Sequence, residues 1–366
     1  MPIGPEMVFV DSTTVLSAGR ELTFFAGNDY HRLSWRSEVR EAVKSSIDLD
    51  GLNLSASRFT TANHRVYMEL EEALADFFGV KRVVFSPSGY SSNLFAFQGV
   101  RSQFDVCLID ELAHPSLVDG ALAANLPILR FDHRNLFSLE IALESTKRER
   151  AIIATDGVFP AVGSAPPLRQ YAELAGRFGA AILIDDAHGV GVLGEAGRGS
   201  VEEFEIAGCP VIQTGTLSKA FGTYGGFVVG DEEVAASVEA NSGAFVGCTP
   251  LPIPLAAAAL CAVRILKKES SRFELLKERT ARFKGQLNSL GFPQFHGIQA
   301  ILRLSGSAEW SERSRGRFTE VGIYPSFIRY PGGPSGGHFR FTLSSSHSDE
   351  ELDKLESAFQ SLEPIS

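Results

Sequence analysis

Residues 181–188 read AILIDDAH, a short apolar run followed by two acids, an alanine and a histidine. A run of this length predicts a buried strand at Ala181–Ile184. In open α/β sheets ligands bind beyond the carboxyl ends of the strands, so Asp185 and His188 lie where a ligand is expected. Taken alone, the stretch has two interpretations: both side chains contact one flat aromatic nitrogen base, or they form an ordinary turn cap with Asp186 in solvent.

Six further apolar runs alternate with helical periodicity on either side of this stretch. Such alternation predicts an α/β fold with a mostly parallel seven-stranded sheet that is covered by helices. The other expected strands are Arg82–Phe85, Val106–Ile109, Ile128–Phe131, Ala151–Thr155, Val211–Thr214 and Gly226–Val229.

The pattern changes after Pro254, where the chain is expected to be helical to about Leu290. The C-terminal part then offers strands at Gln299–Leu304, Ile323–Phe327 and His338–Leu343 and a last amphipathic helix from Asp349. The sequence therefore predicts three parts: an N-terminal segment (1–45), a large ligand-binding domain (46–250) and a smaller C-terminal α/β domain (251–366).

The composition is that of a globular protein, with 44% hydrophobic and 21% charged residues in a chain of 366. A chain of this size buries a large core. The 44 acidic and 34 basic residues give a net charge of −10, which disfavours binding to nucleic acid. The four cysteines are widely spaced without a CxxC pair and are interpreted as buried thiols. We expect a cytoplasmic protein without a metal site.

The N-terminal residues do not resemble a signal peptide, and the longest apolar segment does not resemble a transmembrane helix. The first residues contain Glu6 and Asp11 and no basic region, unlike a signal peptide. The longest apolar run, Leu251–Val263, is interrupted by Pro252 and Pro254 and is too short to span a bilayer. We therefore expect no association with a membrane.

Two other strand ends carry residues that suit a ligand. Ser86–Tyr90 (SPSGY) opens a helix whose free amides suit a phosphate, although a plain helix cap also explains the pattern. Gly215–Gly222 (GTLSKAFG) sets Lys219 among glycines and hydroxyls directly after an apolar run. Most lysines are solvated charges, but a desolvated lysine beside phosphate-binding hydroxyls has a lowered pKa and can form imines.

Together these loops resemble those of the fold-type I pyridoxal-phosphate (PLP) enzymes, and in particular the α-oxoamine synthases, among them the 8-amino-7-oxononanoate synthases of biotin biosynthesis. The family's motifs occur in the family's order and cover almost the whole chain. They are Asn28–Tyr30, Ser88–Tyr90, Asp110–His114, Thr155–Phe159, Asp185–Gly189, Thr216–Lys219 and Arg340–Thr342.

The resemblance assigns the chemical roles to three of these residues. Lys219 would hold PLP as a Schiff base and would also remove the α-proton of the substrate. Asp185 would pair with the pyridine nitrogen and keep it protonated, so that the ring can accept electrons. His188 would form a hydrogen bond with the phenolic oxygen.

The same resemblance assigns residues that hold the cofactor and the substrate. His114 would stack on the ring, and Arg340 would clamp the amino acid's carboxylate in a bidentate fork. Without the resemblance these two would be interpreted as a capping histidine and a surface arginine. The remaining cofactor-binding residues would be Ser88, Gly89, Tyr90, Thr216 and, reaching the neighbouring subunit's phosphate, Thr249, while Asn28 would bind substrate.

The implied reaction is a PLP-dependent decarboxylative condensation of a small amino acid with an acyl-thioester, which gives an α-amino ketone. Alanine, glycine and serine are all used in this family, and the sequence does not select among them. The thioester carrier, coenzyme A or an acyl carrier protein, also stays open. Because the family's sites lie at the subunit boundary, we expect a homodimer.

The sequence departs from the family's pattern at several positions near the expected site. His31 and Arg32 replace the usual Leu-Gly after Tyr30, so that Arg32 is expected either to meet an acidic acyl tail or, as a surface arginine, to be solvated. The N-terminal helix before the first motif is short or missing. The other departures are Asn53–Ser57 in place of a glycine-rich stretch, Tyr67 in place of a histidine, Gly247–Thr249 in place of Ser-Thr-Ser, and Pro160 and Val162 in place of polar residues.

Three alternatives remain open from the sequence. Gly189–Gly194 satisfies the GxGxxG pattern of dinucleotide dehydrogenases, but more glycines follow where a helix should start. A PLP-dependent aminotransferase, aldolase or lyase would use a similar lysine and aspartate. A noncatalytic scaffold paralogue would not need Lys219, Asp185 and Arg340 together.

Overall fold

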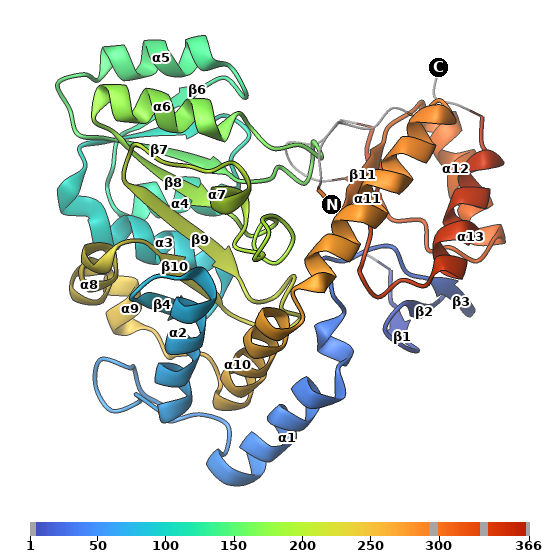
Figure 1. Ribbon diagram of the computed structural model, residues 1–366, viewed down its shortest axis with the longest axis horizontal. Helices are drawn as coiled ribbons and strands as arrows, with labels where there is room; N and C mark the ends of the chain where they lie inside the picture. Colours follow the sequence, from blue (N-terminus) through green and yellow to red (C-terminus); the bar gives the residue numbers. More distant parts are fainter. Residues whose placement is uncertain (1–4, 293–298, 330–335, 364–366) are drawn as a thin grey trace.

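A computed structural model of the chain describes residues 5–292, 299–329 and 336–363 (Figure 1). Its central feature is a seven-stranded sheet with the strand order β4-β10-β9-β8-β7-β5-β6. Only β10 runs antiparallel to its neighbours in this sheet. The strands are β4 (Val83–Ser86), β5 (Val106–Asp110), β6 (Ile128–Phe131), β7 (Ala151–Asp156), β8 (Ala181–Asp185), β9 (Val211–Thr216) and β10 (Gly226–Val229). The predicted mostly parallel α/β sheet is confirmed.

The central strands are apolar on both faces because helices cover both faces. Every residue of β5, β7 and β8 is buried, as expected for strands between two helical layers. Ile152 and Ala154 of β7 face one core, and Ala151 and Ile153 face the other. The first core is covered by α3 (Gly89–Val100), α4 (Pro115–Ala123), α8 (Glu232–Asn241) and α9 (Gly243–Gly247), and the second by α5 (Leu136–Ser145), α6 (Leu168–Phe178) and α7 (Ser200–Glu203).

A third group of helices packs beside β4 and β10. Helix α10 (Ile253–Lys268) packs against α1 (Ser37–Asp50) and α2 (Arg65–Phe78) and shares their apolar core. The next helix, α11 (Ser271–Ser289), belongs to the C-terminal core. The predicted helical stretch after Pro254 is therefore confirmed as two helices, and the division at residue 251 stays a prediction.

The C-terminal part is a three-stranded sheet covered by helices. Its strand order is β11-β13-β12, with β11 at Ile301–Leu304, β12 at Phe327–Ile328 and β13 at His338–Thr342. The helices are α11, α12 (Ala308–Glu320) and α13 (Asp349–Gln360). The strand predicted at Ile323–Phe327 forms only from Phe327, where β12 begins and pairs with β13. Before it, Ile323 makes only an isolated bridge to Thr23, and Pro325 has no N–H for a ladder.

The N-terminal residues pack on this C-terminal part. They form a small antiparallel sheet of β1 (Val8–Phe9), β2 (Thr14–Ser17) and β3 (Arg20–Thr23). The segment that follows joins the C-terminal core through Phe25 and Tyr30. Short 3-10 turns occur at Leu33–Trp35 and Arg101–Gln103.

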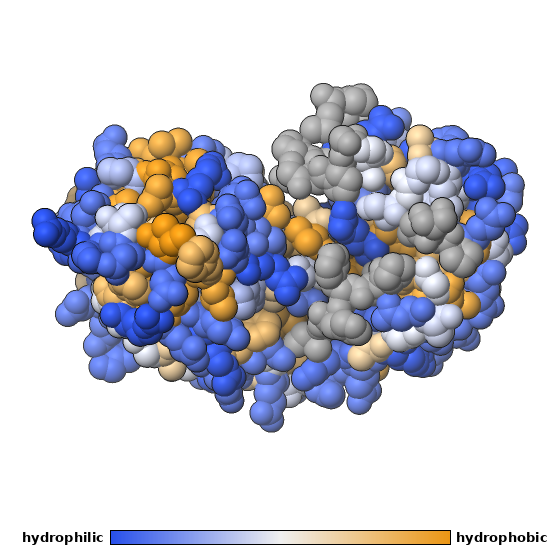
Figure 2. All heavy atoms as spheres, turned by 90° about the horizontal axis from the view of Figure 1, so that it is seen from above, coloured by the Kyte–Doolittle hydropathy of each residue, from blue (hydrophilic) through white to orange (hydrophobic). Residues whose placement is uncertain are grey.

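The molecule has two lobes: one is built on the seven-stranded sheet, and the other consists of the C-terminal part with the small N-terminal sheet. They lie side by side and are joined by α10 and α11 (Figure 1). Figure 2 shows the notch between them from above. In the described part of the chain, no helix combines the length and the apolar character needed to cross a membrane.

Candidate active site

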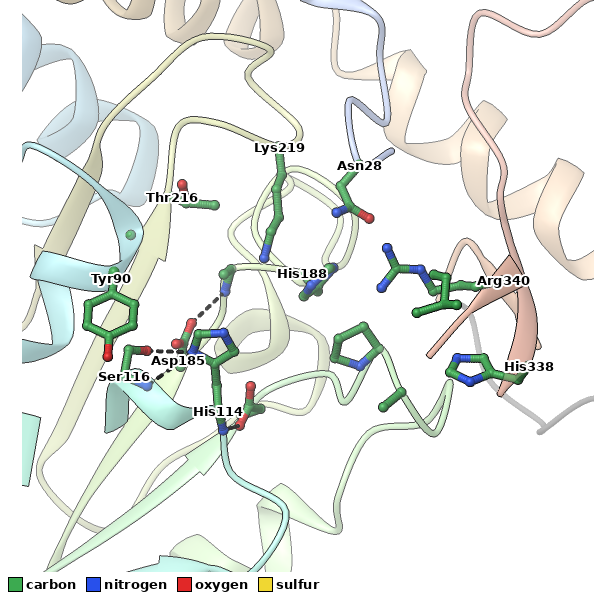
Figure 3. A pocket seen from close by; sticks show the side chains of 16 residues that line it. Asn28, Tyr90, His114, Ser116, Asp185, His188, Thr216, Lys219, His338 and Arg340 are labelled. Atoms are coloured by element: carbon green, nitrogen blue, oxygen red, sulfur yellow. Dashed lines mark hydrogen bonds between the residues drawn. The ribbon is translucent and has the colours of Figure 1, made fainter. Parts of the chain in front are cut away.

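A cavity of about 350 Å³ lies at the carboxyl ends of β7, β8 and β9, between the two lobes (Figure 3). Most of the residues predicted for the site line this one cavity. They are Asn28, Gly89, Tyr90, His114, Asp185, His188, Thr216, Lys219 and Arg340. Residues more than 300 positions apart in the chain therefore meet at one place.

Two predicted residues do not line the cavity. Ser88 is the N-cap of α3, and its side chain forms a capping box with Ser91. Thr249 is exposed in the connection between α9 and α10. Within this chain, Ser88 therefore positions the start of α3, and Thr249 has no contact with the cavity.

Asp185 lies where β8 ends and is 7% exposed. Its carboxylate accepts hydrogen bonds from the backbone N of Ala187 at 3.1 Å and from Asn93 Nδ2 at 2.7 Å. The orientation of Asn93 is fixed, because Thr214 Oγ1 donates to its Oδ1 at 2.6 Å and its Nδ2 also donates to Ser116 Oγ at 2.8 Å. Two N–H donors thus fix the orientation of the Asp185 carboxylate at the end of β8.

Lys219 follows β9 and reaches into the cavity from the side opposite His114 (Figure 3). Burial lowers the pKa of Lys219 to about 8, although Asp185 and Asp156 act in the opposite direction and Arg340 adds to the lowering. A lysine with such a pKa is partly neutral near neutral pH. Its Nζ is therefore available as a nucleophile and as a base.

His188 is held by Tyr30 in a buried hydrogen bond, with Nδ1 at 2.8 Å from the tyrosine oxygen. Burial, helped by the charges of Lys219 and Arg340, keeps the pKa of His188 well below its usual value. The ring is therefore neutral. Because Nδ1 is engaged, Nε2 is the nitrogen left for a ligand.

His114 begins α4 as its N-cap and also lines the cavity. Its Nδ1 lies 2.7 Å from Ser116 Oγ, and its backbone N donates to Asp156 Oδ2 at 2.8 Å. The ring is edge-on to Tyr90, with centroids 6.2 Å apart. The interpretation of His114 as a capping residue is confirmed, and the cap fixes its ring in the cavity wall; its stacking on a cofactor ring stays a prediction.

The C-terminal lobe contributes Arg340, which lies on β13. Asn28 comes from the segment after β3. Arg340 is partly buried. Asn28 Oδ1 is buried and has no hydrogen-bond partner among the described residues. An unpaired buried acceptor that faces a cavity is expected to meet a donor from a ligand.

The chemistry of these groups fits PLP. Asp185 suits a protonated pyridine nitrogen, the amine of Lys219 suits an aldehyde, and the ring of His114 offers a flat wall. A phosphate fits the start of α3, where Gly89 and Tyr90 line the cavity at the positive end of the helix dipole. A Cβ on Gly89 would lie 2.7 Å from Thr216 Cβ, so only glycine lets the helix start and this threonine lie so close.

The glycine-rich loop after His188 has a different role from a dinucleotide fingerprint. Asp186 is fully buried, accepts hydrogen bonds from Ser200 N and Gln213 Nε2 at 2.7 Å each, and does not line the cavity. Side chains at Gly189 or Gly199 would collide with the Asp186 carboxylate. The glycines are therefore needed to wrap the loop around Asp186, and no helix opens there. The turn-cap interpretation of this stretch, which left Asp186 in solvent, is therefore wrong for Asp186.

Sequence reasoning gave no role to several residues that shape the site. Asp156 lines the cavity beside Lys219, and burial, reinforced by the charge of Asp185, raises its pKa. Asn93 and Ser116 orient Asp185 and His114. Asp156 and Tyr30 lie inside motifs that the sequence analysis identified, so their position in the sequence could have indicated a role in the site. Asn93 lies inside a helix, and no motif around it indicates such a role.

The expectation of a solvated Arg32 was also wrong. Arg32 is 6% exposed, its Nη2 donates to the carbonyl oxygen of Phe24 at 2.8 Å, and its guanidinium lies over the Phe24 ring. Its neighbour His31 is buried as well, and burial lowers the pKa of His31 to about 4. Both side chains thus hold the segment after β3 in place, and neither lines the cavity.

Comparisons with known proteins agree with this geometry. Residues 20–359 match the family model of aminotransferase class I and II. The 8-amino-7-oxononanoate synthase of Nitrosococcus oceani is 37% identical over 341 residues, which span 92% of this chain and 90% of that protein. Serine palmitoyltransferase of Sphingomonas wittichii superposes with a TM-score of 0.91 at 25% identity, over 98% of this chain and 92% of that one. A high-resolution structure of SPT with PLP gives 0.90 at 25% identity, over 97% and 91%.

The family match spans nearly the whole chain, and the relatives agree with the motifs quoted from the sequence. The fold is that of the fold-type I PLP enzymes, as predicted. The chain therefore belongs to the aminotransferase class I and II family and, within it, to the α-oxoamine synthases together with 8-amino-7-oxononanoate synthase.

Proposed function

We propose that this protein is a PLP-dependent acyltransferase that condenses a small amino acid with an acyl-thioester, with loss of carbon dioxide, as in 8-amino-7-oxononanoate synthase. The product is an α-amino ketone. One observation carries the proposal: a lysine with a lowered pKa, an aspartate fixed by two N–H donors and an arginine from the other lobe line one cavity in a chain of this family.

The chemistry that PLP supplies when bound is an aldehyde for amines and a ring that accepts electrons from Cα. Asp185 holds a proton at the ring nitrogen, and Asn93 keeps Asp185 in place for this. Tyr90, Thr216 and the start of α3 lie where the phosphate fits.

The remaining residues act on the amino acid. Arg340 binds its carboxylate in a two-pronged fork, which fixes the orientation of Cα. Lys219 Nζ takes the proton from Cα, a transfer for which an amine with a pKa of about 8 is well matched near neutral pH. His114 covers the opposite wall of the cavity and limits the entry of water. The carbon freed of its proton then attacks the thioester carbonyl and the thiolate leaves. The β-keto acid formed in this way loses its carboxylate as carbon dioxide, and protonation at Cα gives the α-amino ketone.

The proposal extends to the setting of the reaction. The donor is an acyl-coenzyme A or an acyl carrier protein thioester, and the compartment is the cytoplasm. A homodimer is proposed because Thr249, the hydroxyl assigned to a phosphate, is exposed and does not line its own cavity. Sedimentation at micromolar concentration is expected to give a mass twice that of one chain, and a stable monomer with full activity would contradict the shared site.

The direct test mixes PLP-loaded protein with alanine, glycine or serine and a panel of acyl-thioesters. Thiol release that depends on one amino acid is expected, because attack on the thioester needs a carbanion from that amino acid. Release is measured with a thiol reagent, and carbon dioxide is measured in parallel. Exchange of the amino acid's α-proton without thiol release would instead favour an aminotransferase, aldolase or lyase. No uptake of PLP would favour the scaffold paralogue.

A further inference from the structure

His338 is a histidine in the cavity wall to which the proposed function gives no task. It lies on β13, lines the same cavity as Lys219 and Arg340, and is 1% exposed (Figure 3). Neither Nδ1 nor Nε2 of its ring has a hydrogen-bond partner among the residues that the structure describes. A fully buried imidazole that leaves both nitrogens unpaired is unusual, because native proteins satisfy nearly all such groups.

The ring is neutral and so offers one donor and one acceptor. Burial lowers the pKa of His338 to about 4, and the positive charges of Arg303 and Arg340 act in the same direction. A neutral imidazole carries one N–H and one lone pair. The surroundings therefore favour an anionic or strongly polar partner for the N–H.

The place of the ring identifies the ligand group that can supply this partner. His338 and Arg340 are two residues apart on one strand, so their side chains lie on the same face of the sheet. The cavity is also lined by the apolar residues Ile328, Pro160 and Ala161, and no residue that the structure describes pairs with His338. A ligand in the cavity is therefore the candidate partner for His338, and the ligand group that suits the neighbouring Arg340 is a carboxylate.

We propose that His338 donates its N–H to the carboxylate of the amino acid substrate, beside the fork of Arg340. A carboxylate has about four lone-pair positions, of which a bidentate arginine uses two, so a further donor is readily accepted. This inference rests on the proposed function, because it takes the amino acid as the ligand of Arg340. It makes His338 a substrate-binding residue that distinguishes amino acids from simple amines.

The test compares His338→Phe, which keeps a flat ring without nitrogens, with His338→Asn, which keeps an N–H donor. Ile328→Leu is the control for a change of shape in the same wall. With PLP-loaded protein, KM and kcat are measured for exchange of the α-proton in heavy water, using alanine, glycine and serine. Binding of propionate, a carboxylate without an amine, and of ethylamine, an amine without a carboxylate, is measured by calorimetry.

His338→Phe is expected to raise KM and the Kd for propionate about tenfold, which corresponds to about 1.4 kcal/mol. Its kcat, its Kd for ethylamine and its uptake of PLP should stay unchanged. His338→Asn should recover most of the loss, and Ile328→Leu should show none. The inference is overturned if His338→Phe binds propionate as the wild type does, or if ethylamine is weakened equally.

Failure of the proposed function gives a different result. If no thioester releases thiol, the condensation is wrong, but proton exchange and propionate binding still decide the role of His338. A wild type that binds neither propionate nor any of the amino acids would overturn the inference itself.

Discussion

Replacement of Lys219 by alanine is expected to abolish turnover, with a loss of about 10³-fold or more. The same amine is assigned both the bond to the cofactor and the proton transfer at Cα, and positioned acid–base groups alone contribute about 10²–10⁴-fold. The prediction is checked by thiol release and by α-proton exchange in purified protein that contains no wild-type chain.

A control must separate the chemistry of Lys219 from the cost of changing a buried lysine. Lys284 in α11 provides this control, because it is 5% exposed and burial lowers its pKa to about 8, yet it lies outside the cavity. Lys284→Met should retain the wild-type rate for the folded fraction. Turnover by Lys219→Ala within tenfold of the wild type would refute the assigned roles.

The comparison of these two lysines also shows why a perturbed pKa does not identify a site. Both have a pKa lowered by burial to about 8. Only Lys219 follows the carboxyl end of a strand of the central sheet, where polar residues at the ends of neighbouring strands also lie. That feature was visible in the sequence, because apolar runs locate the strands and the carboxyl ends of parallel strands share one edge of the sheet.

What sequence reasoning could not supply came from contacts between distant segments. The burial of Asp186 could not be predicted, because a sequence pattern gives no sign that a loop wraps around a carboxylate. Arg32 was expected in solvent because arginine is rarely buried, and its partner is the backbone of Phe24. Asn93 lies within a helix whose residues are mostly apolar or small. In each case a tertiary contact overrides the local preference.

The lobe that carries Arg340 shows the same limit in its strands. The strand predicted at His338–Leu343 is formed as β13, whereas the one expected at Ile323–Phe327 is formed only from Phe327. The motif Arg340–Thr342 pointed to Arg340, which lines the cavity, through resemblance alone. His338, two residues earlier, escaped notice because a single histidine on an apolar strand does not indicate whether its ring has a partner.

Asp185→Asn is expected to slow α-proton exchange by about 100-fold or more while PLP remains bound. An amide cannot hold a proton at the ring nitrogen as a carboxylate does, and loss of one electrostatic group at a reacting centre typically costs about 10²–10³-fold. The local hydrogen bonds add to the effect. Asn93 Nδ2 and the backbone N of Ala187 both donate to the carboxylate, so the NH₂ of an asparagine would face one of these donors.

Asp186→Asn is the matched control, because Asp186 is the adjacent buried carboxylate, also accepts two N–H groups, and does not line the cavity. It is expected to lower thermal stability less than Asp185→Asn, because both donors reach Oδ2 and Oδ1 has no partner among the described residues, so that the NH₂ group can take the Oδ1 position. Its folded protein should nevertheless exchange the α-proton at the wild-type rate. Exchange by Asp185→Asn at the wild-type rate would show that Asp185 does not face the ring nitrogen. An equal loss of α-proton exchange in both variants would show that the effect comes from the packing of the loop and not from the charge at the ring.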